Sequence, residues 1–170
     1  VGNLSQITDP LGHTTTRTYD AVSRLFTQTD PRGKVTHFAY DALNRLTHLE
    51  DPLQGVTAFT YDGNGNLLTV TDARGSVTTH TYDAMDRLAT RTDPLGRGET
   101  FAYDAVGNLL SATDRKGQTT TFTYDALSRR VQSTFADGSV ATFAYDAAGR
   151  LTLADDTADP HRPIVLEYDG

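Results

Sequence analysis

The sequence repeats a Tyr-Asp pair at a fixed spacing. All eight tyrosines are followed by aspartate; the first seven are 21 residues apart and the last step is 23. A unit this short cannot bury its own apolar surface, so neighbouring units have to stack. We therefore predict that 1–170 is a single array of eight units, which end near residues 20, 41, 62, 83, 104, 125, 146 and 169. The repeat-defining residues are Tyr19, Asp20, Tyr40, Asp41, Tyr61, Asp62, Tyr82, Asp83, Tyr103, Asp104, Tyr124, Asp125, Tyr145, Asp146, Tyr168 and Asp169.

The residues before each tyrosine alternate in character. Threonine stands four residues before most tyrosines, as at Thr36, and five units carry phenylalanine two residues before, as at Phe38. A period of two is typical of a β-strand. The segment after a Tyr-Asp turn begins with a leucine, such as Leu46, in all repeats but one. In that repeat Arg130 stands in the place of the leucine. Each unit is thus predicted to contain an outgoing and a returning strand.

Two turns separate these strands. The first follows Tyr-Asp and has Ser, Asn, Asp or Gly four residues after the tyrosine, types that accept left-handed backbone conformations. The second resembles Asp9-Pro10-Leu11-Gly12, which fits a type I turn. In the turn that begins at Asp51, the glycine comes one place later, at Gly55, and Gln54 stands in its usual place. In one other unit Phe135 replaces the aspartate. The predicted fold class is all-β: a repetitive antiparallel hairpin meander of about sixteen strands that twists and coils.

The composition agrees with this fold and excludes several functions. Nineteen of the 22 acidic residues are Asp and 13 of the 15 basic residues are Arg, so the helix formers Glu and Lys are scarce. A net charge of −7 argues against nucleic-acid binding. No apolar run approaches the ~18 residues of a membrane span, which predicts no membrane insertion by this segment. Because the chain begins with Val1, we expect it to be a piece of a longer protein.

The repeat resembles a known family. Tyr145-Asp146-Ala147-Ala148-Gly149-Arg150-Leu151, together with the Asp-Pro-x-Gly-x-x-Thr pattern, is similar to the YD repeat, also called the RHS repeat, of bacterial polymorphic toxins, insecticidal toxin complexes and teneurins. The resemblance implies a coiled sheet that forms part of a hollow β-shell around a C-terminal toxin domain. The implied partners are the rest of the parent shell and the enclosed toxin domain. The implied location is a secreted, cell-surface or delivered bacterial effector, with type VI secretion as one route.

The family also carries a terminal core motif that cleaves itself with an aspartate. No such segment is found here. The stretch Asp93–Arg97 has a superficial likeness to that motif, but it stands where an ordinary turn is expected, so no protease role is assigned to it.

Two functions follow from this reading. The first is a non-catalytic structural segment of a shell that encapsulates a toxin or effector domain. The alternative is an extracellular adhesion module that uses the Tyr-Asp ladder to bind carbohydrates or cell-surface partners. The two differ in the role of the tyrosine: it packs at a strand end in the first and contacts a ligand in the second, while the aspartate bonds its turn in the structural interpretation.

The histidines, the remaining carboxylates and the arginines form no sequence motif of a known kind of site. The five histidines occupy different places in their repeats, which predicts no metal ligand set, and no cofactor fingerprint is present. A glycosidase pair among the carboxylates is not excluded by the sequence. The acidic stretch Asp155–Pro160 could hold Ca²⁺, but we expect residues 153–163 to be an irregular insertion. The arginines after the turns, such as Arg24 and Arg45, are interpreted as surface charges paired with aspartates.

Overall fold

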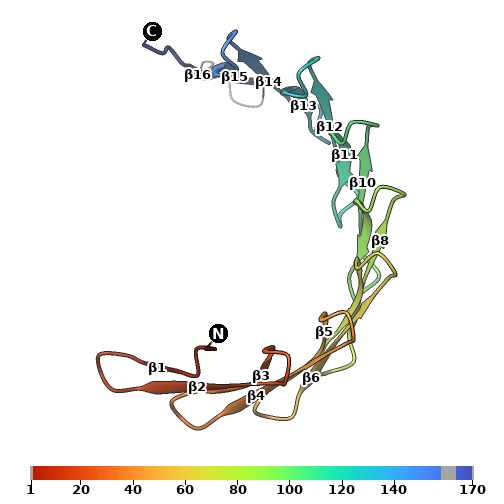
Figure 1. Cartoon of the computed structure of the whole chain (residues 1–170). Coiled ribbons are helices and arrows are strands. Elements are labelled where there is room, and N and C mark those ends of the chain that lie inside the picture. The colour runs from red at the N-terminus through yellow and green to blue at the C-terminus, as the bar shows by residue number, and fades with distance from the viewer. Residues whose placement is uncertain (1, 158–163, 170) are drawn as a thin grey trace. The chain divides into compact units, whose positions relative to one another are not determined.

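The computed structural model describes residues 2–157 and 164–169 and contains sixteen strands there, with no helix. Their contacts divide the chain into two compact parts, Val1–Asp86 and Arg87–Gly170. These are called the first and the second unit from here on, and the 21-residue units of the sequence are called repeats. Within each unit, every strand pairs antiparallel with the next strand along the chain, and Figure 1 shows these hairpins following one another. The prediction of an all-β hairpin meander is confirmed. No helix in the described residues is long and apolar enough to cross a membrane.

The first unit contains eight strands, two for each repeat. Strands that end at a tyrosine have six residues, and the strands that follow a Tyr-Asp turn from β3 onward have five. Their bounds are β1 Gln6–Thr8, β2 Thr14–Tyr19, β3 Leu25–Thr29, β4 Val35–Tyr40, β5 Leu46–Glu50, β6 Val56–Tyr61, β7 Leu67–Thr71 and β8 Val77–Tyr82.

The second unit repeats the same alternation from β9 to β14, while β15 has six residues and β16 has two. Its strands are β9 Leu88–Thr92, β10 Gly98–Tyr103, β11 Leu109–Thr113, β12 Thr119–Tyr124, β13 Arg130–Thr134, β14 Val140–Tyr145, β15 Leu151–Asp156 and β16 Ile164–Val165. The first four residues of the expected insertion 153–163 belong to β15, while 158–163 lie outside the described residues.

The register changes by one residue at each paired tyrosine. In the β4–β5 hairpin, Tyr40 pairs with Leu46 and Ala39 pairs with His48, so Thr47 has no partner across the pair. The same irregularity recurs in the β2–β3, β6–β7, β10–β11, β12–β13 and β14–β15 hairpins. Such a β-bulge increases the local twist and changes the direction of the neighbouring side chains.

The two faces of each sheet differ in exposure. In β4, Thr36, Phe38 and Tyr40 are half-buried, whereas His37 and Ala39 on the opposite face are exposed. We call the first of these the Tyr face. Among the described residues, Ala141 is the only buried hydrophobic residue, because no second layer of secondary structure covers either sheet. Contacts along each sheet, between one repeat and the next, therefore carry the stability of each unit.

Candidate functional site: the Tyr-Asp-Arg ladder and an acidic groove

The turn after each tyrosine is built around the aspartate of the Tyr-Asp pair. The backbone N–H of Asp41 donates to the carbonyl oxygen of Arg45 at 3.0 Å, and the N–H of Asn44 donates to the carbonyl oxygen of Asp41 at 3.1 Å. Asn44 has a φ of 64°, which is the left-handed region. The serine, asparagine, aspartate or glycine at this place in each repeat is thus explained by the backbone.

The aspartate side chain completes the turn. The Asp41 Oδ1 atom accepts hydrogen bonds from the backbone N–H groups of Leu43 at 2.9 Å and Arg45 at 3.0 Å. The Arg45 N–H bond, above all, holds the pKa of the Asp41 carboxyl below its ordinary value. The pKa values of Asp20 and Asp125 are lowered in the same way by the equivalent N–H groups. These carboxylates are therefore charged at neutral pH and already have donors.

The Asp-Pro turns at the other end of the hairpins have the same geometry. The Gly96 N–H donates to the Asp93 carbonyl at 2.9 Å, and Asp93 Oδ1 accepts from the N–H groups of Leu95 and Arg97. The Arg97 guanidinium is the main reason that the pKa of Asp93 is lowered. The Asp93 stretch is an ordinary turn of this kind, with its aspartate 8% exposed.

The Asp51–Gly55 turn, whose glycine is shifted by one place in the sequence, does not use that glycine for its left-handed position. The turn from Asp51 to Gly55 keeps its five-residue form, because Gln54 adopts the left-handed conformation with a φ of 66°. Gly55 serves another purpose: a Cβ atom there would lie 2.7 Å from Asp51 Oδ2 and 3.0 Å from the Ala73 Cβ. The glycine therefore permits a close approach of side chains and does not supply the turn conformation.

The turn that lacks its aspartate also keeps its backbone. The Phe135 N–H donates to the Ser139 carbonyl at 2.9 Å, and Gly138 closes the turn with a φ of 84°. Asp137, two residues later, accepts from the backbone N–H and the hydroxyl of Ser139 at 2.9 and 2.6 Å. The Ser139 hydroxyl is the main cause of a lowered pKa of the Asp137 carboxyl.

The tyrosine hydroxyl joins two successive Tyr-Asp hairpins, such as β4–β5 and β6–β7, and contacts between repeats are counted below between hairpins of this kind. In the first unit, the Tyr61 hydroxyl donates to the Leu46 carbonyl oxygen at 2.8 Å. Six other tyrosines donate to the corresponding carbonyl: Tyr19 to Leu4, Tyr40 to Leu25, Tyr82 to Leu67, Tyr124 to Leu109, Tyr145 to Arg130 and Tyr168 to Leu151. These seven tyrosine hydroxyls are thus bonded within the chain itself.

An arginine joins one Tyr-Asp hairpin to the Tyr-Asp hairpin after it. The Arg45 Nε atom lies 2.7 Å from Asp41 Oδ2, and Nη1 donates to the Asp62 carbonyl at 2.9 Å. The same guanidinium stacks 4.7 Å from the centre of the Tyr61 ring. Equivalent stacking pairs are Arg24 with Tyr40, Arg87 with Tyr103, Arg129 with Tyr145 and Arg150 with Tyr168. The sequence predicts the pairing with aspartate, but it does not show the stacking on the next repeat.

Asparagine replaces this arginine in two repeats and still contacts the neighbour. The Asn66 Nδ2 atom donates to its own Asp62 at 3.0 Å and to Asp86 in the next turn at 2.7 Å. Asn108 bonds Asp104 and the Ser128 hydroxyl in the same way. A short donor therefore bridges two turns where the guanidinium is absent.

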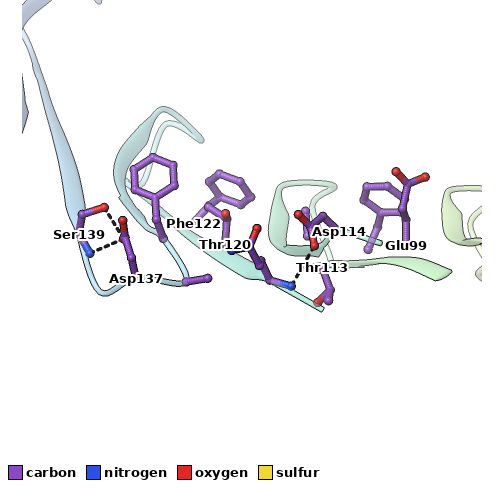
Figure 2. Close-up of a pocket in the computed structure, with 12 residues that line it drawn as sticks. Glu99, Thr113, Asp114, Thr120, Phe122, Asp137 and Ser139 are labelled. Atoms are coloured by element: carbon purple, nitrogen blue, oxygen red, sulfur yellow. Dashed lines mark hydrogen bonds between the residues drawn. The ribbon is translucent and has the colours of Figure 1, made fainter. Parts of the chain in front are cut away.

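The Tyr face of the second unit carries a groove of about 460 Å³ (Figure 2). Phenylalanine rings and carboxylates line it together, and hydroxyl and amide groups complete its walls. The lining residues are Glu99, Phe101, Ala112, Thr113, Asp114, Gln118, Thr120, Phe122, Phe135, Ala136, Asp137 and Ser139. No sequence motif marks this groove, because it arises from residues that vary between repeats.

The structure does not bring the other candidate residues together. The described ranges contain no group of three or more histidine, aspartate or glutamate side chains placed to hold a metal ion. His13 bonds its own turn through Asp9 at 2.9 Å. Asp155 and Asp156 of the acidic stretch are part of β15, and His161 lies outside the described residues.

Comparisons with known proteins identify the family. The family model described as RHS Repeat matches residues 1–34, 24–56, 61–97, 103–140 and 129–159. The chain therefore belongs to the RHS repeat family, which confirms the resemblance seen in the Tyr-Asp pattern. No curated protein matches the chain significantly.

Solved structures show the same fold. The crystal structure of TcdB2-TccC3-Cdc42 is similar with a TM-score of 0.69 and 22% identity, over 87% of this chain and 9% of that chain. TcdB2-TccC3 and the Photorhabdus luminescens Tc holotoxin pore each match with a TM-score of 0.70 and 23% identity, over 85% of this chain and 9% of theirs. The chain thus spans about a tenth of these proteins, and the likeness concerns the fold.

Proposed function

We propose that the chain is a non-catalytic segment of an RHS shell wall, whose parent protein encloses a C-terminal toxin or effector domain. The observation that carries this proposal is the ladder of contacts between repeats. The Arg45 guanidinium, for example, is shared between the aspartate of its own turn and the tyrosine of the next Tyr-Asp hairpin. Such contacts favour an extended wall, which the repeats can lengthen one unit at a time.

The Tyr-Asp pairs have a structural role in this proposal. The hydroxyl of Tyr61 is bonded to a backbone carbonyl, its ring is covered by a guanidinium, and Asp41 bonds its own turn. A group that catalyses a reaction or binds a ligand has to present free donors, acceptors or ring faces to it. These residues use theirs within the chain, which supports a wall that acts sterically.

The partners and location follow from the same proposal. The chain would adjoin the remaining repeats of its parent shell and line a space that holds the effector domain. The parent would be a secreted or delivered protein of a bacterium. The supporting comparison is the match to TcdB2-TccC3 and to a Tc holotoxin pore, which is a match of fold.

Electron microscopy of the parent protein tests this function. We expect a hollow particle whose wall contains these repeats, with density for an additional domain inside, and we expect added protease to spare that domain until the shell is opened. A parent deleted for the segment that follows the repeats is the matched control and should show an empty interior. A solid particle, or an effector domain that protease digests in the intact parent, would show that the repeats do not enclose it.

A further inference from the structure

A small residue, Ala112, lies in the lining of the groove on the Tyr face. Ala112 on β11 pairs with Phe101 on β10 and with Thr120 on β12. The equivalent position carries larger side chains in the four preceding hairpins, Gln28, Leu49, Val70 and Arg91, and small ones in the two that follow, Ser133 and Ala154. With only a methyl group there, the space between the Phe101 and Phe122 strands stays open and forms the groove of about 460 Å³.

The space between two successive phenylalanines of the Tyr face is called an interval here. The interval between Phe122 and Phe143, which follows the one between Phe101 and Phe122, shows which group fits between two such rings. Ser133 is the small residue there, and it pairs with Phe122. The guanidinium of Arg130 lies 5.6 Å from the centre of the Phe122 ring and 5.0 Å from that of Phe143. Arg130 replaces the leucine of other repeats, so one interval has its own cation between the rings. The interval at Ala112 has Leu109 in that place and no guanidinium of its own there.

The charged residues that line the groove are acidic, and only Glu99 among them is paired with arginines. Glu99 is paired with Arg115 at 3.3 Å and lies 3.7 Å from Arg91. Asp114 accepts only backbone N–H groups among the described residues, at 2.8 and 2.9 Å, and Asp137 bonds Ser139. Neither of these two aspartates forms an ion pair in the described part of the chain. Figure 2 shows Asp114 and Asp137 on either side of Thr120 and Phe122.

We propose that this groove binds an arginine or lysine side chain of an extended polypeptide. The cation would lie between the Phe101 and Phe122 rings, with Asp114 and Asp137 as its counter-charges and with its alkyl stem against the rings. The walls supply Thr120 and Gln118 as hydrogen-bonding groups for the peptide backbone. This site does not depend on whether the repeats enclose a cavity, so it goes beyond the proposed function.

Titration of the 170-residue chain with two peptides tests the site. One is a short glycine peptide with a single central arginine, and the other has citrulline in its place, which keeps the shape but removes the charge. Amide chemical shifts in NMR spectra measure binding and locate it. We expect shifts at β10–β12 and at the Phe135–Ser139 turn, and binding of the citrulline peptide at least about fivefold weaker. Equal binding of the two peptides would overturn the proposal.

Matched variants separate the groove from general electrostatic attraction. Ala112→Leu fills the space with the residue that Leu49 places at the equivalent position, and Val70→Leu adds bulk at that position in the other unit. We expect Ala112→Leu to weaken binding at least about fivefold while Val70→Leu leaves it unchanged. Asp137→Asn should weaken binding about three- to fivefold, and Asp72→Asn should not. Undiminished binding in both Ala112→Leu and Asp137→Asn would show that the cation binds elsewhere.

Discussion

At the scale of single residues, the Tyr-Asp pair divides two tasks between neighbours in the chain. The aspartate organises its own turn, since the carboxylate of Asp41 accepts two backbone N–H groups that the turn leaves without partners. The tyrosine acts on another hairpin, because the Tyr61 hydroxyl of β6–β7 donates to the Leu46 carbonyl of β4–β5. One dipeptide therefore closes a turn and joins two repeats, and this explains why it recurs as a pair.

The hydroxyl of Tyr61 provides a direct test of the contact between repeats. Tyr61→Phe removes the 2.8 Å bond to the Leu46 carbonyl but keeps the ring under Arg45. We expect the free energy of unfolding to fall by about 1 kcal/mol and the melting temperature by about 3 °C, measured by thermal unfolding. Tyr61→Leu also removes the stacked ring and should cost more. An unchanged melting temperature in Tyr61→Phe would mean that water replaces the bond without loss.

The turn carboxylates predict how stability depends on pH. The folded state lowers the pKa of Asp20, Asp41 and Asp125 below the ordinary value of 3.8, so the unfolded chain binds protons first as pH falls. Their contribution is fully present above that value and is lost as pH falls through the folded pKa values.

Thermal melts from pH 7 to pH 2 measure this effect. We expect little change due to these groups above about pH 5 and a progressive loss of stability below about pH 4. Asp41→Asn keeps an oxygen acceptor but cannot titrate in this range, so its loss on acidification should be shallower than that of the unmodified chain. A melting temperature that rises between pH 4 and pH 2 would contradict the assignment.

At the scale of strands and turns, both ends of each hairpin use one five-residue turn. Its first residue is an aspartate in nearly every case, and its fourth has a positive φ, as at Asn44 and Gly96. The two turn motifs look different in sequence because proline is present in only one of them, yet their hydrogen bonds are the same. The hairpins are therefore more regular than the sequence pattern suggests.

The turn at Asp51 offers a test of this regularity. Gln54 adopts a φ of 66°, a conformation that costs a residue with a Cβ atom about 1 kcal/mol. Gln54→Gly should raise the free energy of unfolding by about 0.5 to 1 kcal/mol. Gly55→Ala should lower it, because the new Cβ would meet Asp51 Oδ2 at 2.7 Å. Chemical denaturation measures both, and stabilisation by Gly55→Ala would show that the glycine is not needed for close approach.

The sequence predicts the elements well because their signals are local. The alternation around Phe38 and Tyr40 predicts β4, and the Asp-Pro and Tyr-Asp turns predict where strands end. The bulge at each paired tyrosine is not predicted by the sequence. The unpaired residue in β4–β5 is Thr47, and threonine also occurs at paired positions of these strands. The stack of Arg45 on Tyr61 also depends on a register between repeats that no local pattern contains. The groove at Ala112 can be predicted only when it is known which side chains fill the neighbouring intervals.

At the scale of the whole molecule, each repeat depends on the repeats beside it in the chain. Almost no side chain in the described residues is fully shielded from solvent, so no central core fixes the fold of either unit. What holds a repeat are the ladder hydrogen bonds, the tyrosine hydroxyls and the arginine stacks, all of which reach only the adjacent repeat. Stability is then a sum of local terms, and repeats can be removed or added provided that their phase is kept.

Deletion of a repeat tests this dependence on phase. Removal of the 21 residues 57–77 joins Val56 to Thr78, so that Tyr82 keeps its distance from the Asp51 turn and its place on the Tyr face. Removal of the 20 residues 57–76 leaves one extra residue in the fused strand and turns Tyr82 and His80 to the opposite face. We expect the first deletion to keep the β-sheet circular dichroism spectrum and a cooperative melt, and the second to melt at least about 10 °C lower than the first. Equal melting temperatures for the two chains would show that contacts on the Tyr face between adjacent repeats do not determine stability, and the nearest-neighbour description of the fold would have to be abandoned.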